Sequence, residues 1–527
     1  MKRMRRIMKT IVSVFIVLLL GLGVLIEKAG TWALGLFGGI SIDEIIFHLK
    51  VPLSGTDSST IVQFIKVCLF PALAVMLLVV GIMILPGMER SFRKKREKKT
   101  GRKLFLQVQW KKKTKVSGEP FLTWHVPFGV IVAVAVITFG WGTYRICQKY
   151  PVIEYFTTQG NTSPWIEEEY VIPDASLLTW PKEKRNLIYI YLESMETSFS
   201  SVENGGAFEK DMIPELMELA KENVSFSDDE TLAGGATEAT STGWTIAGMF
   251  GQTAGLPLKL PIDSNNMGEY AEFFPGVTSL GDLMEEAGYH NYLLIGSDAV
   301  FGGRNNYFSQ HGSYELLDYG WAMREGKIPE EYKVFWGYED KRLFDIAKEM
   351  ILNAAAQEEP FNVTMLTVDT HFPDGYTCEL CTDEFDTPYK NALACSSRQV
   401  MEFVRWIQEQ DFYKNTTVIL SGDHITMATG IISEMPADYQ RRIYNCFINA
   451  DAETEMTKNR QFTVMDLFPT TLAALGVEIE GERLALGTNL FSGEQTLAEK
   501  FGIDYINEQM AMKSEFYDDK LLYNNWD

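Results

Sequence analysis

The chain has 527 residues, of which 46% are hydrophobic and 12% aromatic, so intrinsic disorder is excluded as a description of the whole chain. It carries 48 Lys and Arg residues against 70 Asp and Glu residues, a net charge of −22. Nucleic-acid-binding proteins usually show the opposite balance, so no nucleic-acid partner is expected. Six cysteines in this length are too few for a disulfide-rich scaffold.

The charge is divided unevenly along the sequence. Residues 1–147 contain 22 basic and 7 acidic residues, a net charge of +15, which leaves −37 for residues 148–527. A basic, apolar first part followed by an acidic remainder predicts a membrane anchor joined to a globular domain. The length of the chain also favours two or more structural units over a single core.

Three apolar segments, residues 10–26, 67–85 and 126–144, are each close to the roughly 20 residues that cross a bilayer. The first follows the basic sequence MKRMRR and, taken alone, also fits a signal peptide. The two later segments favour an uncleaved anchor with three helices. Residues 33–46 are apolar too but include Asp43 and Glu44, which predicts a piece outside the membrane or at its surface.

The segment between the second and third spans, residues 90–115, holds 13 Lys and Arg residues and one acidic residue. The positive-inside rule predicts a cytoplasmic loop; contact with RNA or anionic lipid is the alternative. Three spans then place everything after residue 144 outside the cell membrane. We therefore divide the chain into an anchor (1–147), a juxtamembrane connector (148–184) and an extracytoplasmic domain (185–527).

Four apolar runs in the last part of the chain are predicted to be buried strands. They alternate with helical patterns, which predicts an α/β domain with a central, mostly parallel sheet flanked by helices. The four runs are residues 187–192, 292–295, 363–368 and 417–420.

Polar and reactive side chains follow each of these runs. Because ligands bind at the carboxyl ends of strands in open α/β sheets, we expect these side chains to converge. Carboxylates and imidazoles together are typical ligands of a divalent metal. Taken singly, each has a simpler interpretation, such as a helix cap for Glu193 or a surface pair for Asp423 and His424. The residues concerned are Glu193, Ser297, Asp298, Arg304, Asp369, His371, Asp423 and His424.

The segment 234–257, GGATEATSTGWTIAGMFGQTAGLP, leads into a predicted helix that begins near Gly243. Helix N-termini attract phosphate, and a bound dication lowers the pKa of a hydroxyl and makes it a nucleophile. A plain N-cap is the simpler role of a hydroxyl residue here. Spacing alone does not rank the candidates, which are Thr237, Thr240, Ser241, Thr242 and Thr245.

Four motifs in combination resemble the phosphoglycerol transferase I and lipoteichoic acid synthase family of the alkaline-phosphatase-like (sulfatase) superfamily. The resemblance covers roughly residues 184–493 and implies that residues 185–527 form a sulfatase-like catalytic domain. The segments 463–477 and 484–493 also resemble the closing part of that superfamily. The four motifs are NLIYIYLES at 186–194, TGWTIAGM at 242–249, LTVDTHFPDG at 366–375 and SGDH at 421–424.

The resemblance implies a role for individual residues. Thr242 matches the nucleophilic threonine, His371 the histidine that contacts the substrate phosphate or leaving group, and Arg304 a phosphate-binding arginine. The region around Thr242 lacks the Cys or Ser motif of true sulfatases, which argues against hydrolysis of sulfate esters. The metal ligands that the resemblance implies are Glu193, Thr242, Asp423 and His424.

The resemblance further implies a multi-pass membrane enzyme that transfers phosphoglycerol. The donor would be phosphatidylglycerol, the acceptor a glycan or polyglycerol-phosphate polymer outside the membrane, and a threonine-linked intermediate would connect the two steps. The expected cofactor is Mn²⁺, with Mg²⁺ or Zn²⁺ as alternatives. Alternative functions are a phosphoethanolamine transferase, a lipid phosphodiesterase, and a catalytically silent anchored domain that binds surface polymer.

Three cysteines, Cys378, Cys381 and Cys395, lie close together in a predicted outside loop. The sequence CELC resembles half of a zinc knuckle, but three cysteines without a fourth ligand make a poor zinc site. Members of the family have cysteines that match Cys381 and Cys395, so the resemblance implies a disulfide between them. Free thiols are the alternative.

Overall fold

The computed structural model describes residues 2–37, 41–51, 58–100, 105–107, 120–122, 126–261 and 272–526. The chain forms two compact units, one made of Met1–Gly35 and Ser58–Val152 and the other of Leu36–Asp57 and Ile153–Asp527. The segment between the first two apolar helices therefore belongs to the same unit as the α/β domain.

Long helices make up the first unit. Three of them are long and apolar enough to cross a membrane, over Ile7–Leu36, Thr60–Leu85 and Phe128–Lys149, which identifies a membrane protein. Each helix extends beyond the expected segment at one end or both, and the third begins two residues later than expected. The elements of this unit are α1 (Lys2–Phe37), α3 (Ser58–Phe64), a π-helical turn (Ile65–Leu69), α4 (Phe70–Thr100), β1 (Phe105–Gln107), β2 (Pro120–Leu122) and α5 (Phe128–Lys149).

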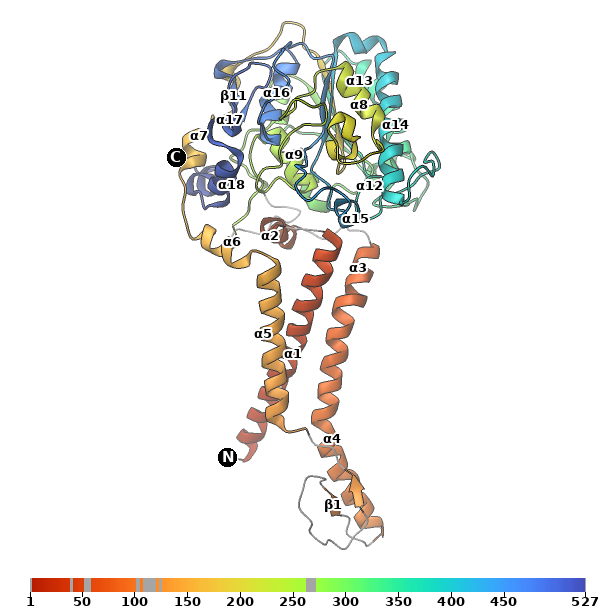
Figure 1. Ribbon diagram of the computed structural model, residues 1–527, viewed down its shortest axis with the longest axis vertical. Helices are drawn as coiled ribbons and strands as arrows, with labels where there is room; N and C mark the ends of the chain where they lie inside the picture. Colours follow the sequence, from red (N-terminus) through yellow and green to blue (C-terminus); the bar gives the residue numbers. More distant parts are fainter. Residues whose placement is uncertain are drawn as a thin grey trace. The chain divides into compact units, whose positions relative to one another are not determined.

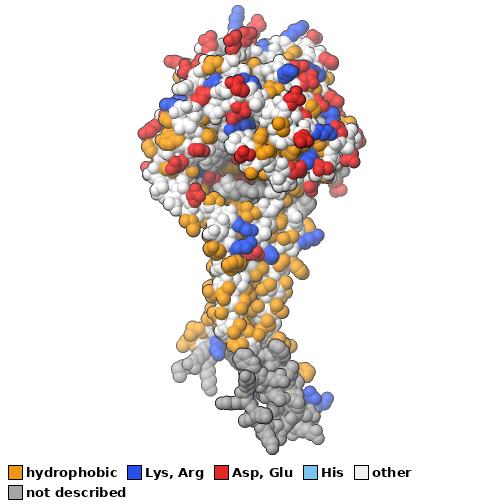
Figure 2. All heavy atoms as spheres, viewed as in Figure 1, with side chains coloured by type: hydrophobic (Ala, Val, Ile, Leu, Met, Phe, Trp, Pro, Cys, Tyr) orange, Lys and Arg blue, Asp and Glu red, His pale blue; other side chains and the backbone are white. Residues whose placement is uncertain are grey.

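Helices α1 and α5 pack closely through glycine. A Cβ added at Gly142 would lie 2.6 Å from the carbonyl oxygen of Gly23, and one added at Gly23 would lie 2.7 Å from the backbone of Phe139. Small residues let helices approach in this way in membranes. Apolar side chains such as Leu77 and Ile137 point outward, 72% and 68% exposed, and similar residues cover the described helices (Figure 2). This surface is suited to lipid.

The basic segment 90–115 was expected to be a loop, and this is wrong for its first part. Helix α4 continues to Thr100, because Lys, Arg and Glu are good helix formers and no glycine or proline interrupts residues 90–100. Residues 105–107 form β1. Residues 101–104 and 108–115 lie outside the described part of the chain.

A six-stranded sheet of order β6-β5-β7-β4-β8-β9 forms the centre of the second unit. The strands are parallel except for β9, which runs antiparallel to β8. The predicted mostly parallel sheet is confirmed, and the four predicted strands lie side by side in its middle. The bounds are β4 (Asn186–Leu192), β5 (His290–Ile295), β6 (Glu315–Leu317), β7 (Phe361–Leu366), β8 (Thr416–Gly422) and β9 (Asn445–Ile448).

Both faces of the sheet are covered. Tyr189 and Tyr191 of β4 belong to one hydrophobic core, and Ile188 and Ile190 to the other. Strands that are buried on both faces read as continuous apolar runs, which explains why the sequence reveals them.

Helices from distant parts of the sequence cover each face (Figure 1). On the face of Tyr189 they are α9 (Thr245–Ala254), α10 (Leu280–Glu286), α11 (Arg304–Gln310), α16 (Leu467–Ala474), α17 (Leu497–Phe501) and α18 (Ile503–Ala511). On the face of Ile188 they are α8 (Pro214–Glu222), α12 (Tyr319–Arg324), α13 (Asp340–Ala355), α14 (Pro388–Gln408) and α15 (Thr429–Ile432).

Residues of the expected connector pack onto the α/β domain. Trp165 lies against Phe501 and Trp180 against Tyr289, with ring centroids 6.1 and 5.5 Å apart. The smaller elements of the described chain are α2 (Ile42–Lys50), α6 (Val152–Gln159), α7 (Trp165–Glu169), β3 (Leu178–Thr179), β10 (Glu478–Ile479), β11 (Arg483–Leu484) and β12 (Gly487–Thr488).

The buried carboxylate of Glu196 is held by Arg441. The Nε and Nη2 atoms of Arg441 donate hydrogen bonds to the two carboxylate oxygens at 2.7 and 2.6 Å, and Nη2 also donates to the carbonyl of Thr426 at 2.6 Å. Glu196 is fully buried, so loss of the guanidinium leaves its charge unpaired. We expect Arg441→Met to lower the free energy of unfolding by about 3–5 kcal/mol, measured by denaturant unfolding of the full chain in detergent.

A matched surface substitution is the control for this prediction. Arg398 pairs with Glu384 at 2.8 Å, and the two side chains are 30% and 42% exposed. Arg398→Met should therefore change the free energy of unfolding by less than about 1 kcal/mol. Equal losses in the two variants would contradict a special contribution from the buried pair.

Candidate active site

Two neighbouring strands deliver the candidate metal ligands. Glu193 directly follows β4, and Asp423 and His424 directly follow β8, so parallel pairing of these strands brings the three side chains to one edge of the sheet. Nε2 of His424 lies 3.4 Å from Oδ2 of Asp423 and 3.6 Å from Oε1 of Glu193. One ligand atom of each residue lies within 4.8 Å of those of the other two. This spacing suits the ligands of one cation.

The three residues are buried, and the pKa of each one is shifted by the charge of at least one of the other two. Burial and the charge of Glu193 raise the pKa of Asp423 to about 7. Burial alone would lower the pKa of His424, but the charges of Asp423 and Glu193 outweigh it and raise the pKa to about 10. Burial would raise the pKa of Glu193, but the positive charges of His371 and His424 lower it to about 2. Buried carboxylates of this kind require a cationic partner.

The donor set fits a divalent cation. Oδ1 of Asp423 accepts hydrogen bonds from the backbone N–H groups of Ser194 and His424 at 2.7 and 2.9 Å. Its other oxygen, Oδ2, is buried without a hydrogen-bond partner. A buried polar atom of this kind is the usual mark of an ion or water position. Two carboxylates and one imidazole are suitable ligands for Mn²⁺, Mg²⁺ or Zn²⁺.

Thr242 lies in the turn before α9 and is fully buried. Its hydroxyl donates to the carbonyl of Ala239 at 2.8 Å and accepts from the N–H of Ala239 at 3.0 Å. A Cβ added at Gly248 would lie 1.8 Å from the carbonyl oxygen of Asp423 and 3.4 Å from that of Thr242. The turn, the first part of α9 and the end of β8 are therefore in direct contact.

The hydroxyl that reaches the carboxylates is that of Thr245, the first residue of α9. It donates to Oε2 of Glu193 at 3.4 Å. Thr240 and Ser241, which spacing left as equal candidates, direct their hydroxyls to other residues. The structure thus places Thr242 and Thr245 near the strand ends, with the hydroxyl of Thr242 turned toward its own backbone.

His371 follows β7 and contacts aromatic rings. Its Nδ1 donates to the carbonyl of Phe372 at 2.8 Å, and its ring centroid lies 4.6 Å from that of Trp336. Because a carbonyl oxygen only accepts, Nδ1 carries the proton and Nε2 keeps a lone pair. Burial lowers the pKa of His371, and the charge of Glu193 offsets part of that effect.

Arg304 begins α11 and is 4% exposed. Its Nε and Nη2 donate to the carbonyls of Phe301 and Asp298 at 3.1 and 2.8 Å. Burial lowers its pKa to about 10, against the opposing charge of Glu193 and other acidic residues. The guanidinium therefore stays protonated at neutral pH and supplies positive charge near Glu193.

Helix α2 is a part of this region that sequence reasoning missed. Oδ2 of Asp43 accepts a hydrogen bond from the hydroxyl of Ser241 at 2.7 Å, directly beside Thr242. Phe47 is fully buried, and its ring lies 5.7 Å from that of Trp244. In the sequence, the only indication of this role was the acidic pair Asp43 and Glu44 inside an apolar segment.

Two more acidic residues lie near His424. Burial raises the pKa of Glu44 in α2 to about 8, while the charge of His424 lowers it. Burial also raises the pKa of Glu238 against the charge of His424, and its Oε2 is buried without a hydrogen-bond partner. These carboxyl groups add to the excess of buried acidic side chains around the candidate metal ligands.

The disulfide that the resemblance implied between Cys381 and Cys395 is wrong for this structure. All six cysteines lie in the described part of the chain and are free thiols. Both cysteines instead contact Cys378. The Sγ atom of Cys381 lies 3.8 Å from that of Cys378, and the Sγ atom of Cys395 lies 3.9 Å from it. Because Cys378 contacts both of the other cysteines, the three thiols form one cluster and Cys381 and Cys395 do not form a pair of their own.

Residues 185–477 match the family described as Sulfatase, and this match covers more than half of the chain. The chain belongs to the sulfatase family. The candidate catalytic and metal-binding residues of this sulfatase-family member all lie within the matched region, whereas α2 lies outside it.

Curated relatives carry the name phosphoglycerol transferase I. One from Xanthomonas campestris pv. campestris is 30% identical over 314 residues, which cover 58% of this chain and 43% of that protein. One from Escherichia fergusonii is 31% identical over 330 residues, which cover 61% of this chain and 41% of that protein. The chain thus spans less than half the length of the curated relatives that it matches.

Solved structures are similar at lower identity. Lipoteichoic acid synthase LtaP from Listeria monocytogenes is 18% identical, with a TM-score of 0.46 and coverage of 62% of this chain and 80% of that one. Lipooligosaccharide phosphoethanolamine transferase A from Neisseria meningitidis is 13% identical, with a TM-score of 0.48 and coverage of 90% and 87%.

Proposed function

We propose that this sulfatase-family member is a membrane-anchored, metal-dependent phosphoglycerol transferase. The observation that carries the proposal is the meeting of Glu193, Asp423 and His424 at the ends of two adjacent strands, beside the buried turn of Thr242. The curated relatives named phosphoglycerol transferase I support the choice of transferred group.

In the first step of the proposed reaction, Oγ1 of Thr242 attacks the phosphorus of phosphatidylglycerol. The bond from phosphorus to the diacylglycerol oxygen breaks, the threonine proton passes to that oxygen, and phosphoglyceryl-threonine forms. Thr242 must first rotate about its Cα–Cβ bond, since its hydroxyl faces Ala239. The cation, which we propose to be Mn²⁺, would be held by the ligands named above and would lower the pKa of the hydroxyl. Arg304 would pair with the phosphate.

In the second step, an acceptor hydroxyl attacks the phosphorus of phosphoglyceryl-threonine. Nε2 of His371 takes the proton of this hydroxyl, the bond from phosphorus to Thr242 breaks, and the proton then passes from His371 to the threonine oxygen, which restores both residues. The acceptor we propose is a glycan or polyglycerol-phosphate polymer outside the membrane. If water attacked the intermediate in place of the acceptor, the enzyme would be a phosphodiesterase, so a transferase must exclude water from this step.

The pH dependence should reveal the protonation state of His371. The residue works as a base in its neutral form, and burial places its pKa below the ordinary value of 6.5. Activity should therefore be retained at pH 6.5 and should fall only as the pH decreases through the lowered pKa. His371→Gln should slow turnover by about 10²–10⁴-fold and remove this acid limb from the profile of kcat/KM. An acid limb centred above pH 6.5 would oppose the assignment.

The topology of the anchor follows from the distribution of Lys and Arg. We expect residues 90–115 in the cytoplasm and residues 151–527 outside, because cytoplasmic loops carry the excess of basic residues. Reporter fusions after Gly118 and after Thr179 should therefore give opposite signals. The same signal from both fusions would rule out a three-span anchor with this orientation.

The function itself is tested with fluorescent phosphatidylglycerol and the purified full chain in detergent, with and without Mn²⁺. We expect diacylglycerol release that depends on Mn²⁺, and transfer of phosphoglycerol when a glycan acceptor is added. Turnover of phosphatidylethanolamine alone would favour a phosphoethanolamine transferase. Free glycerol phosphate as the product in the presence of acceptor would favour a phosphodiesterase. No turnover of either lipid would refute the proposal.

A further inference from the structure

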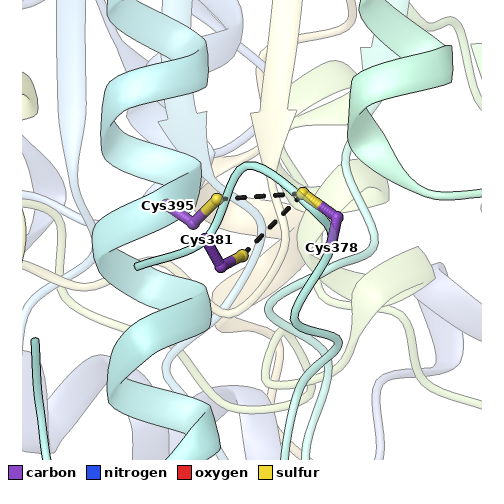
Figure 3. A group of neighbouring side chains, drawn as sticks. All are labelled: Cys378, Cys381 and Cys395. Atoms are coloured by element: carbon purple, nitrogen blue, oxygen red, sulfur yellow. Dashed lines mark hydrogen bonds between the residues drawn. The ribbon is translucent and has the colours of Figure 1, made fainter. Parts of the chain in front are cut away.

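Three thiols outside the candidate active site point toward one another (Figure 3). Cys378 and Cys381 lie in the loop after His371, and Cys395 lies on α14. The Sγ atom of Cys378 is 3.9 Å from that of Cys395 and 3.8 Å from that of Cys381. All three sulfur atoms lie within 4.8 Å of one another.

The spacing of these atoms is that of ligands around one metal ion. Zinc binds thiolates at about 2.3 Å in tetrahedral geometry, so neighbouring sulfur atoms lie about 3.8 Å apart. The sulfur atoms of a disulfide are only about 2.0 Å apart, and pairing any two of these thiols would leave the third alone. The three sulfur atoms therefore have the spacing of a zinc site, and the fourth ligand that the sequence did not supply must come from elsewhere.

The amide side chain of Gln399 contacts two of the three sulfur atoms. Nε2 of Gln399 donates to Sγ of Cys395 at 3.4 Å and to Sγ of Cys378 at 3.9 Å, and amide N–H groups stabilise negative sulfur. Oε1 of Gln399 is buried without a hydrogen-bond partner, so rotation of the amide would offer this oxygen as a ligand.

A cavity borders the site at one of the three cysteines. It measures about 220 Å³ and is lined in part by Tyr376, Cys378 and Glu379. The buried carboxyl groups of Asp340 and Asp369 interact electrostatically with Cys378. Oδ2 of Asp369 has no hydrogen-bond partner. A dication at the thiols would favour the charged forms of these two carboxyl groups.

We propose that Cys378, Cys381 and Cys395 bind a thiophilic dication, zinc, at a site separate from Glu193, Asp423 and His424. Each thiol loses a proton to solvent on binding, and the fourth position is filled by water or by Gln399. The metal would fasten the loop that follows His371 to α14, so its role is structural. This inference does not depend on the proposed transfer reaction.

The test uses the full chain, purified in detergent without oxygen and loaded with Co²⁺ as a spectroscopic probe for zinc. Cobalt bound by thiolates gives a sulfur-to-metal charge-transfer band, which oxygen and imidazole ligands do not give. We expect this band in the wild type and in Asp423→Ala. In Cys378→Ser the affinity should fall by at least about 10–100-fold, with the band lost. Cys446→Ser, a buried thiol in β9, should keep it.

A second measurement uses the wild type alone, so its result does not depend on whether Cys378→Ser folds. Zn²⁺ should protect Cys378, Cys381 and Cys395 from alkylation, and a chelator should restore labelling, as read by peptide mass spectrometry. Absence of the charge-transfer band in the wild type would overturn the proposal. So would a peptide linked by a disulfide between two of these residues in the anaerobic protein, or alkylation that Zn²⁺ does not change.

Discussion

Thr242→Ala is expected to abolish release of diacylglycerol while leaving the protein folded. The substitution removes the proposed nucleophile and the two hydrogen bonds with Ala239. Loss of such bonds costs about 1–3 kcal/mol, which is small against the stability of a domain. Thr242→Ser keeps the hydroxyl and should retain part of the turnover. The measurement is the rate of diacylglycerol release, with circular dichroism to establish folding.

Thr245→Val is the matched control for this experiment. It removes the hydroxyl that donates to Glu193 at 3.4 Å with little change in shape, and it should reduce turnover less than Thr242→Ala. If Thr242→Ala turned over normally and Thr245→Val did not, the nucleophile would be Thr245. If both variants kept the wild-type rate, Thr240 and Ser241 would be the next candidates.

Asp423→Ala and His424→Ala should each remove both metal and activity. Each substitution deletes one of three converging ligands and leaves the remaining charges poorly balanced. Disturbing the groups that only support metal ligands costs about 10–100-fold in affinity or activity, so loss of a ligand should cost at least that much. The measurements are turnover and metal content per chain by mass spectrometry.

Surface residues of the same types provide controls. His290 is half exposed and pairs with Glu315 at 3.4 Å, and Asp411 is fully exposed. His290→Ala and Asp411→Ala should keep wild-type metal content and activity. If Asp423→Ala and His424→Ala behaved like these controls, the strand ends would not be the metal site.

The sequence predicted the parts of the fold that depend on local patterns. β4 and β8 appear as continuous apolar runs because both of their faces are buried, and the residue that follows each run lies at the carboxyl edge of the sheet. Glu193 and Asp423 could therefore be placed together before the structure was known. The continuation of α4 to Thr100 could also have been predicted from its composition, but its basic charge was taken as the mark of a loop.

Other parts depend on contacts that no local pattern encodes. Asp43 and Ser241 are 198 positions apart in sequence, so the packing of α2 beside the candidate nucleophile had no signal beyond two acidic residues in an apolar segment. Spacing could not rank Thr242 and Thr245, since both lie within one turn of the start of α9. The convergence of Cys378 with the other two thiols likewise depends on how the loop after His371 meets α14.

The most direct test of the central claim is a search for the covalent intermediate. The full chain is incubated with phosphatidylglycerol and Mn²⁺ but no acceptor, quenched in acid and analysed by peptide mass spectrometry. A transferase that acts in two steps stores the group on the protein between them, so the peptide that contains Thr242 should gain one phosphoglyceryl group, and Thr242→Ala should gain none. Turnover of the lipid with no adduct on any peptide after rapid acid quenching would contradict the account.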